Sequence, residues 1–204
     1  LVAIPLATVI ALCLANNISA LFSVIALAAV LAYLVFNFPV RANRRIRTFM
    51  GDAGSTMLGF VVFWEVLRVS QGSAALITPV AGLWLASIPV YDSLTCFVLR
   101  IRKGRSPFTP GRDHFHHELR RGGFAGREKL AILGGLQAIY AVVGVGGSLA
   151  GVPDVVLFAA WSVLGLTQRS VIKWISIRHR KYLLTMYRTG RLDPQRASRV
   201  KELL

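Results

Sequence analysis

The stretch FMGDAGSTMLGFVVFW at residues 49–64 decides how the chain is interpreted. It follows a basic loop, places Asp52 directly after Gly51, and then runs apolar in the manner of a membrane span. Asp52 is the first acidic residue of the chain. We therefore expect a helix that opens near Gly51. The carboxylate in its first turn either caps the helix or holds a cation over a substrate.

The composition predicts an integral membrane protein. Of the 204 residues, 54% are hydrophobic, which is too many for an ordinary soluble domain. A membrane span needs about 20 mostly apolar residues, and six stretches qualify, the first of them cut short: 1–15, 18–38, 51–69, 76–100, 130–150 and 155–175. The predicted fold is all-α, a polytopic helical bundle of about six spans. We expect a transmembrane domain over residues 1–176 and a basic tail over residues 177–204.

Positive charge gathers on one side of this predicted bundle. Of the 24 Lys and Arg residues, 21 lie in residues 41–47, 100–129 and 178–201, which share one side if every stretch crosses. Basic loops stay on the cytoplasmic side, so the loops that carry the motifs are expected to face the cytoplasm. The net charge of +15 then needs no nucleic acid, since the charges follow the ends of the spans and lack a stacking surface of interleaved aromatics. The tail is expected either to lie on the anionic leaflet or to be solvated.

Polar residues inside the apolar stretches need partners. Glu65 and Arg68 are spaced for an ion pair on the helix surface near the outer interface. Asp92 lies eight residues before Arg100, roughly 12 Å from the cytoplasmic end of its stretch. An ionisable residue at that depth is costly. It either faces a polar interior or is a paired structural carboxylate.

Small residues in the same stretches also allow two interpretations. Gly51, Ser55 and Gly59 form a stripe on one helix face, which either admits a neighbouring helix or serves a ligand. Cys13 and Cys96 have no metal-ligand spacing and are expected to be packing residues.

The loop PFTPGRDHFHH at residues 107–117 contains a histidine cluster, His114, His116 and His117, next to Arg112. Three imidazoles suit Zn²⁺, and imidazoles beside arginine also suit phosphate. We favour phosphate, because the surrounding basic residues repel a cation and attract an anion. With Asp52, these residues describe a cytoplasmic site for a phosphorylated lipid and a soluble phosphate compound.

Four motifs resemble the polyprenyl-phosphate N-acetylhexosamine-1-phosphate transferases: FMGDAGST at 49–56, PVAGLW at 79–84, IPVYD at 88–92 and RKGRSPFTPGRDHFHH at 102–117. The resemblance implies transfer of a sugar 1-phosphate, expected to be N-acetylglucosamine 1-phosphate, from a UDP-sugar to undecaprenyl phosphate. UMP is released, Mg²⁺ or Mn²⁺ is the cofactor, and the bacterial inner membrane is the location.

The resemblance also implies roles for single residues. Asp52 falls on the family's metal-binding aspartate, and the three histidines fall on its histidine motif. The implied catalytic residues are Asp52, His114, His116 and His117, and the implied substrate-binding residues are Asn37, Arg112, Arg102 and Lys103.

One departure limits this resemblance. The family has an adjacent Asp-Asp pair upstream of the matched region, and this chain has no acidic residue before Asp52. We therefore expect this chain to be the C-terminal portion of such an enzyme and to be inactive without the missing N-terminal half. Homo-oligomerisation is possible. Three alternatives remain: a non-catalytic membrane module that binds lipid head groups or a partner subunit, a transporter that uses Asp92, and a zinc protein.

Overall fold

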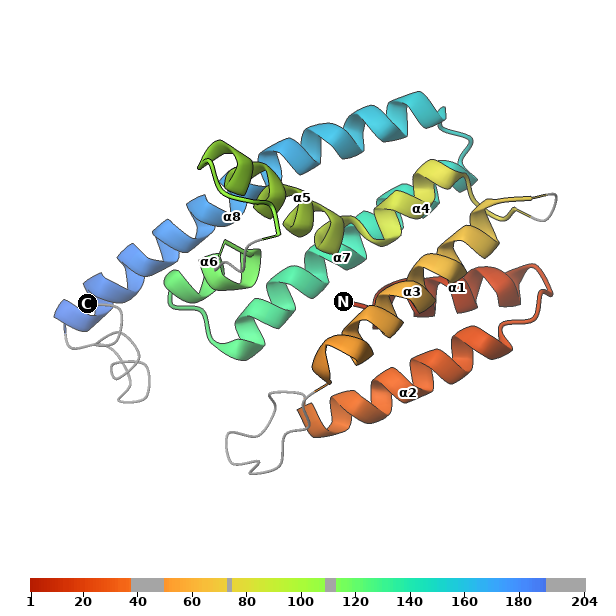
Figure 1. Cartoon of the computed structure of the whole chain (residues 1–204), viewed down its shortest axis with the longest axis horizontal. Helices are drawn as coiled ribbons and strands as arrows, with labels where there is room; N and C mark the ends of the chain where they lie inside the picture. Colours follow the sequence, from red (N-terminus) through yellow and green to blue (C-terminus); the bar gives the residue numbers. More distant parts are fainter. Residues whose placement is uncertain (38–49, 73–74, 109–112, 190–204) are drawn as a thin grey trace. The chain divides into compact units, whose positions relative to one another are not determined.

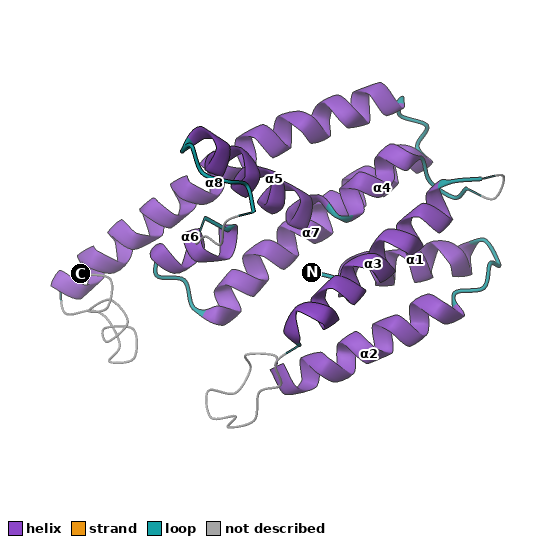
Figure 2. Ribbon diagram, viewed as in Figure 1, coloured by secondary structure: helices purple, strands orange, loops and turns teal. Residues whose placement is uncertain are grey.

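The computed structural model describes residues 1–37, 50–72, 75–108 and 113–189, and every regular element in these ranges is a helix (Figures 1 and 2). The helices are α1 (Ala3–Ala15), α2 (Leu21–Asn37), α3 (Gly51–Ser70), α4 (Pro79–Leu85), α5 (Ser87–Arg102), α6 (Phe115–Arg121), α7 (Gly126–Leu149) and α8 (Asp154–Arg188). The all-α prediction is confirmed. The basic loop at residues 41–47 lies outside the described residues.

The number of spans differs from the expected six. Among the described helices, α3, α7 and α8 are long and apolar enough to cross a membrane, and α4 with α5 makes a fourth if the pair counts as one span. With 13 and 17 residues, α1 and α2 are shorter apolar helices, and α2 ends at the edge of the described residues. The described residues therefore supply three or four helices of span length and two shorter apolar helices, against about six expected spans, and this is consistent with a polytopic membrane protein.

The stretch expected to form one span over residues 76–100 is broken. The axes of α4 and α5 are bent by 81°. Thr78 caps α4, because its hydroxyl accepts the N–H of Ala81 at 3.3 Å, and Pro79 occupies the first turn. No second broken pair occurs in the described ranges, so the paired breaks expected of the transporter alternative are not seen there.

Gln137 of α7 satisfies the backbone groups that the break leaves open. Its Nε2 donates to the carbonyls of Trp84 and Leu85 at 3.1 and 2.8 Å, and its Oε1 accepts the N–H of Ile88 at 3.0 Å. Pro89 has no N–H to reach the Leu85 carbonyl four residues earlier. The fully buried Gln137 amide supplies that donor. A carbonyl without a hydrogen-bond partner would cost several kcal/mol in apolar surroundings.

The chain divides into two compact units, residues 1–88 with 133–161 and residues 89–132 with 162–204. In the first unit, α1 packs against both α2 and α3 (Figure 1). Its core includes Val9, Cys13, Val69 and Leu85, so Cys13 is a packing residue as predicted. The second unit contains α6 with most of α5 and the later part of α8.

Helix α8 is longer than a span. Its 35 residues extend about 52 Å at 1.5 Å per residue, while the apolar core of a bilayer is about 30 Å thick. The helix therefore continues without interruption past residue 176, the predicted boundary between the transmembrane domain and the basic tail, and ends at Arg188. That division stays a prediction, and residues 190–204 lie outside the described ranges.

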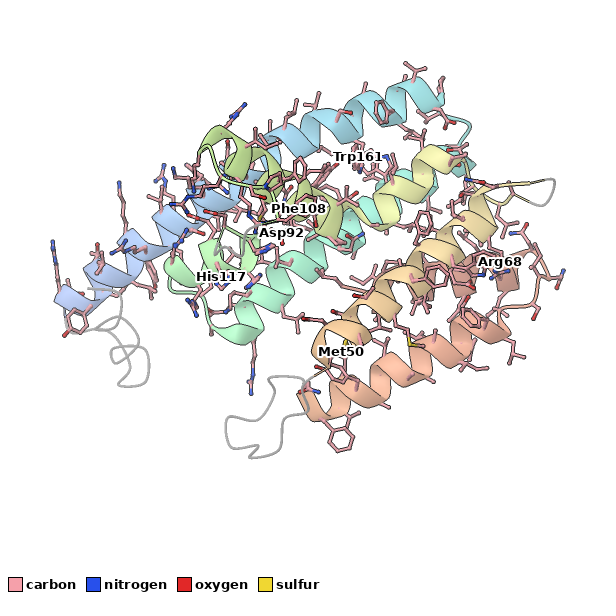
Figure 3. The ribbon with its side chains drawn as sticks, viewed as in Figure 1. Met50, Arg68, Asp92, Phe108, His117 and Trp161 are labelled. Carbon is pink, nitrogen blue, oxygen red and sulfur yellow. The ribbon has the colours of Figure 1, made fainter. Side chains whose placement is uncertain are left out.

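The Glu65–Arg68 pair forms, but it is not a surface pair. Arg68 Nη2 lies 2.8 Å from Glu65 Oε2, at the end of α3 opposite Met50 (Figure 3). The Glu65 side chain is only 1% exposed, against 32% for Arg68, and Ser23 Oγ of α2 also donates to Oε2. A buried carboxylate thus joins α2 to α3, and the expected exposed position of Glu65 is wrong.

The small-residue stripe on α3 does not hold a neighbouring helix among the described residues. A Cβ at Gly51 or Gly59 would meet no atom within 4 Å. Close helix approach occurs elsewhere, where a Cβ at Gly144 of α7 would lie 2.2 Å from Cβ of Trp84.

We expect Gly144→Ala to lower the free energy of unfolding by about 2 kcal/mol, because the added methyl overlaps the fixed base of the Trp84 side chain. Gly146→Ala is the matched control on the same helix, since its Cβ would meet nothing within 4 Å. It should be neutral or stabilising by up to about 1 kcal/mol. Thermal unfolding in detergent measures both, and equal melting temperatures would contradict the close contact.

We expect Arg68→Met to destabilise the first unit by about 2 kcal/mol, because it leaves the buried Glu65 carboxylate without its cation. The double variant Glu65→Gln/Arg68→Met should recover part of this loss, since the charge is then removed as well. Equilibrium unfolding of the single and double variants tests the coupling. Purely additive effects would show that the pair contributes nothing.

Candidate functional site

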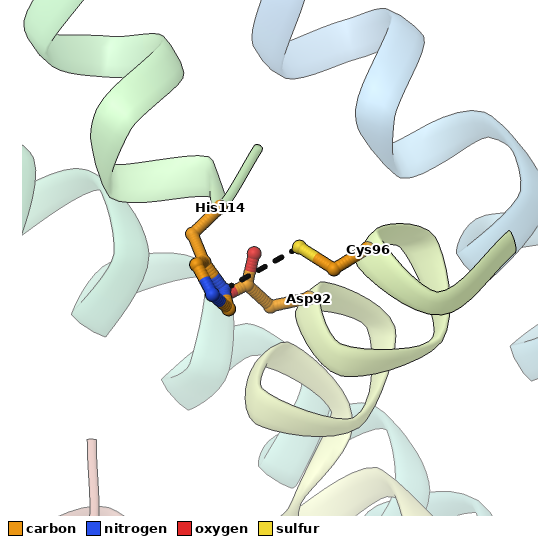
Figure 4. Close-up of side chains that lie close together, drawn as sticks. All are labelled: Asp92, Cys96 and His114. Carbon is orange, nitrogen blue, oxygen red and sulfur yellow. Dashed lines mark hydrogen bonds and ion pairs between the residues drawn. The ribbon is translucent and has the colours of Figure 1, made fainter. Parts of the chain in front are cut away.

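Asp92, in the second turn of α5, binds the beginning of α6 (Figure 4). Its Oδ1 accepts the backbone N–H of Phe115 at 2.7 Å, and its Oδ2 lies 3.0 Å from Nδ1 of His114. The first N–H groups of a helix have no partner within the helix, so Asp92 caps α6 from a different helix. Phe115 and Leu119, 2% and 0% exposed, fix α6 from its apolar side.

Cys96 lies one turn after Asp92, with Sγ 3.4 Å from His114 Nδ1. Ligand-type atoms of Asp92, Cys96 and His114 all lie within 4.8 Å of one another. A thiol and an imidazole suit zinc, whereas Mg²⁺ requires oxygen ligands. Both Asp92 oxygens are already used in hydrogen bonds. Hydrogen bonding thus accounts for this cluster, which does not fit Mg²⁺.

The three histidines of the predicted motif lie together. Ring centroids of His116 and His117 are 4.1 Å apart, and the His114 ring stacks on His116 at 5.7 Å with an interplanar angle of 17°. Partial burial and the adjacent His117 lower the pKa of His116 below its ordinary value. This shift favours the neutral form of the His116 imidazole, which has a single N–H to donate to an anion.

The other end of α6 is held by α8. His179 Nδ1 donates to the carbonyl of Gly122 at 2.8 Å, and its ring stacks on Phe124 with centroids 3.8 Å apart. A Cβ at Gly122 would lie 2.8 Å from Cα of Ser176, so only glycine permits this approach. The helix that presents His116 and His117 is thus fixed at both ends.

Basic side chains surround the connection between α5 and α6. Lys103 Nζ lies 3.1 Å from Asp113 Oδ1, and this hydrogen bond lowers the pKa of Asp113. Arg100 donates to the carbonyl of Pro107. Arg102, at the end of α5, is exposed. Positive charge therefore predominates beside the imidazoles, as an anion site requires.

The structure brings together only part of the predicted site. His114, His116, His117, Arg102 and Lys103 belong to the second unit. Asp52 is exposed in the first turn of α3 and Asn37 ends α2, both in the first unit, and their approach to the histidines stays a prediction. Arg112 lies outside the described residues.

Sequence reasoning missed the partners that hold the motif. Asp92 stood out as a carboxylate in an apolar stretch, and a histidine-rich loop was available to pair with it. Cys96 had no ligand spacing to indicate its place beside His114. His179 lies in a basic, partly amphipathic segment, where nothing local indicates a contact with Gly122.

Comparison with known proteins supports the resemblance. Residues 1–70 match the model of glycosyl transferase family 4. The chain is 38% identical over 148 residues to the undecaprenyl-phosphate alpha-N-acetylglucosaminyl 1-phosphate transferase of Yersinia pestis, covering 72% of the chain and 40% of that protein. Proteins of the same name are 44% identical in Salmonella typhi (58% of the chain, 32% of the relative) and 35% in Pasteurella multocida (67% and 38%). No solved structure matches the chain.

The matched region spans at most 40% of the length of these relatives. The helical membrane architecture, the four motifs and these alignments agree. The chain is similar to the undecaprenyl-phosphate alpha-N-acetylglucosaminyl 1-phosphate transferases over part of their length, and its residues 1–70 match the model of glycosyl transferase family 4.

Proposed function

We propose that the chain contributes part of a membrane phosphoglycosyl transferase. The complete enzyme transfers N-acetylglucosamine 1-phosphate from UDP-N-acetylglucosamine to undecaprenyl phosphate and releases UMP. The observation that carries the proposal is the histidine cluster, which is held by Asp92 and His179 and surrounded by basic side chains. The names of the relatives supply undecaprenyl phosphate and the transferred N-acetylglucosamine 1-phosphate, and the UDP donor follows from the motif resemblance.

The reaction requires an anion site of this kind. An oxygen of the lipid phosphate attacks the β-phosphorus of the UDP-sugar in line. A new O–P bond forms, the bond from that phosphorus to the bridging oxygen breaks, and UMP leaves with the electron pair. Imidazole N–H groups and basic side chains would stabilise the charge gathered by the two substrates, and positioning supplies most of the catalysis.

Mg²⁺, with Mn²⁺ as its substitute, is the proposed cofactor, and Asp52 is the described residue that fits it. Mg²⁺ is usually held by one or two carboxylates together with substrate phosphates, and Asp52 offers an exposed carboxylate at a helix beginning. When bound, the ion would neutralise diphosphate charge and stabilise the leaving group. Carboxylates from the part of the enzyme not spanned by the chain would complete the site.

The proposed location is the bacterial inner membrane, with the α5–α6 connection in the cytoplasm. The predominance of Lys and Arg around α6 follows the positive-inside rule. A soluble UDP-sugar then reaches the histidines from the cytoplasm while the lipid phosphate stays in the bilayer.

We expect membranes with this chain alone to form no labelled lipid from UDP-[³H]N-acetylglucosamine and undecaprenyl phosphate. Co-expression with the part of the Yersinia pestis relative that the chain does not cover should restore both lipid labelling and UMP release. Turnover by the chain alone would contradict its proposed dependence on the remaining part. Absence of product when both parts accumulate would favour a non-catalytic module.

In the restored enzyme, Asp52→Asn should lower the rate by at least about 100-fold, because it removes a charged ligand at the reacting diphosphate. Asp154→Asn is the matched control, since Asp154 also lies in the first turn of an apolar helix. It should stay within about twofold of the unaltered enzyme. Equal losses in the two variants would assign Asp52 a helix-stabilising role only.

A further inference from the structure

We infer that Asp92 is a positioning residue for His114, which it holds with the proton on Nδ1 so that the ring meets the diphosphate through Nε2. The inference rests on the proposed function and adds a residue to it. Neither the motif resemblance nor the relatives' names assign this aspartate a role.

The hydrogen bonds determine which ring nitrogen carries the proton. An ionised carboxylate only accepts hydrogen bonds, so the 3.0 Å contact between Asp92 Oδ2 and His114 Nδ1 places a proton on Nδ1. Nε2 is then the nitrogen left to meet a ligand. When Nε2 also takes a proton, the resulting imidazolium donates to an anion while Asp92 stabilises its charge.

The same carboxylate fixes the backbone next to the ring. Oδ1 accepts the N–H of Phe115 at 2.7 Å, so two adjacent residues at the beginning of α6 are bound by one side chain. Backbone and imidazole therefore keep one orientation, which a single hydrogen bond to the ring would not ensure.

Asp92 itself sits on a rigid support. Its neighbour Tyr91 is 2% exposed, and a Cβ at Gly165 of α8 would lie 2.5 Å from the Tyr91 ring. The α5 backbone is thus packed closely against α8 beside Asp92. By contrast, the His114 side chain is 34% exposed, so the ring remains accessible to a ligand.

A metal site is the competing explanation for this cluster, because Cys96 Sγ also approaches Nδ1, at 3.4 Å. The hydrogen-bond explanation accounts for more contacts. It uses both Asp92 oxygens, whereas a bound cation would have to separate Oδ2 from Nδ1. The charges that act on Cys96 are mixed: Arg100 and Arg169 oppose a cation, whereas Asp92 and Asp113 favour one.

Nitrogen-15 NMR of the histidine-labelled chain in detergent tests the inference. At about pH 8.5, where an ordinary imidazole is neutral, the His114 ring should carry its proton on Nδ1. Asp92→Asn keeps an oxygen for the Phe115 N–H but turns an amide N–H toward Nδ1. The proton should therefore move to Nε2, a change that mere capping of α6 would not produce.

Inorganic pyrophosphate is the binding probe, at neutral pH. In the unaltered chain it should perturb the Nε2 resonance of His114, and Asp92→Asn should weaken its binding about tenfold by replacing a charge-assisted hydrogen bond with a neutral one. Cys96→Ala is the matched control beside the same nitrogen and should change neither the tautomer nor the affinity by more than about twofold.

Each result bears on the inference. A proton on Nε2 in the unaltered chain overturns it, and this holds even if Asp92→Asn does not fold. It is also overturned by unchanged tautomer and affinity in Asp92→Asn, or by stoichiometric zinc that both Asp92→Asn and Cys96→Ala release. The expected tautomer without pyrophosphate binding supports the positioning role and counts against the proposed function alone.

Discussion

A carboxylate within an apolar helix must find hydrogen-bond donors, and the second unit is arranged around that requirement at Asp92. The donors come from the beginning of α6, where one backbone N–H and one imidazole meet the two carboxylate oxygens. Such an arrangement satisfies the charge and the open helix end together. The histidine motif therefore has a defined orientation because an ionisable residue in the preceding helix needed partners.

The same constraint explains the polar joints of the first unit. The break between α4 and α5 would leave backbone groups without hydrogen-bond partners, and the Gln137 side chain satisfies them with three hydrogen bonds. Glu65 is buried where Ser23 and Arg68 meet it. A buried polar side chain in apolar surroundings therefore marks a contact between helices, because a polar group without a hydrogen-bond partner costs more free energy there than in water.

The basic side chains between α5 and α6 have two roles, one structural and one electrostatic. Lys103 is paired with Asp113, and Arg100 holds the Pro107 carbonyl, so part of the positive charge shapes the connection itself. The imidazoles lie between this connection and the turn held by His179. A diphosphate recognised there would meet groups whose positions are set before it arrives, which is what electrostatic catalysis of phosphoryl transfer requires.

The sequence by itself determined the helical class, the apolar segments, the opening of α3 at Gly51 and the identity of the histidine motif. These features depend on composition and periodicity within one segment, which act locally. Span lengths were less certain, because the break between α4 and α5 and the extension of α8 depend on partners. Only the tertiary structure decided that Asp92 meets His114, Gln137 meets Ile88 and His179 meets Gly122, pairs separated by 22, 49 and 57 residues. Contacts at such separations arise from helix packing, which no single segment encodes.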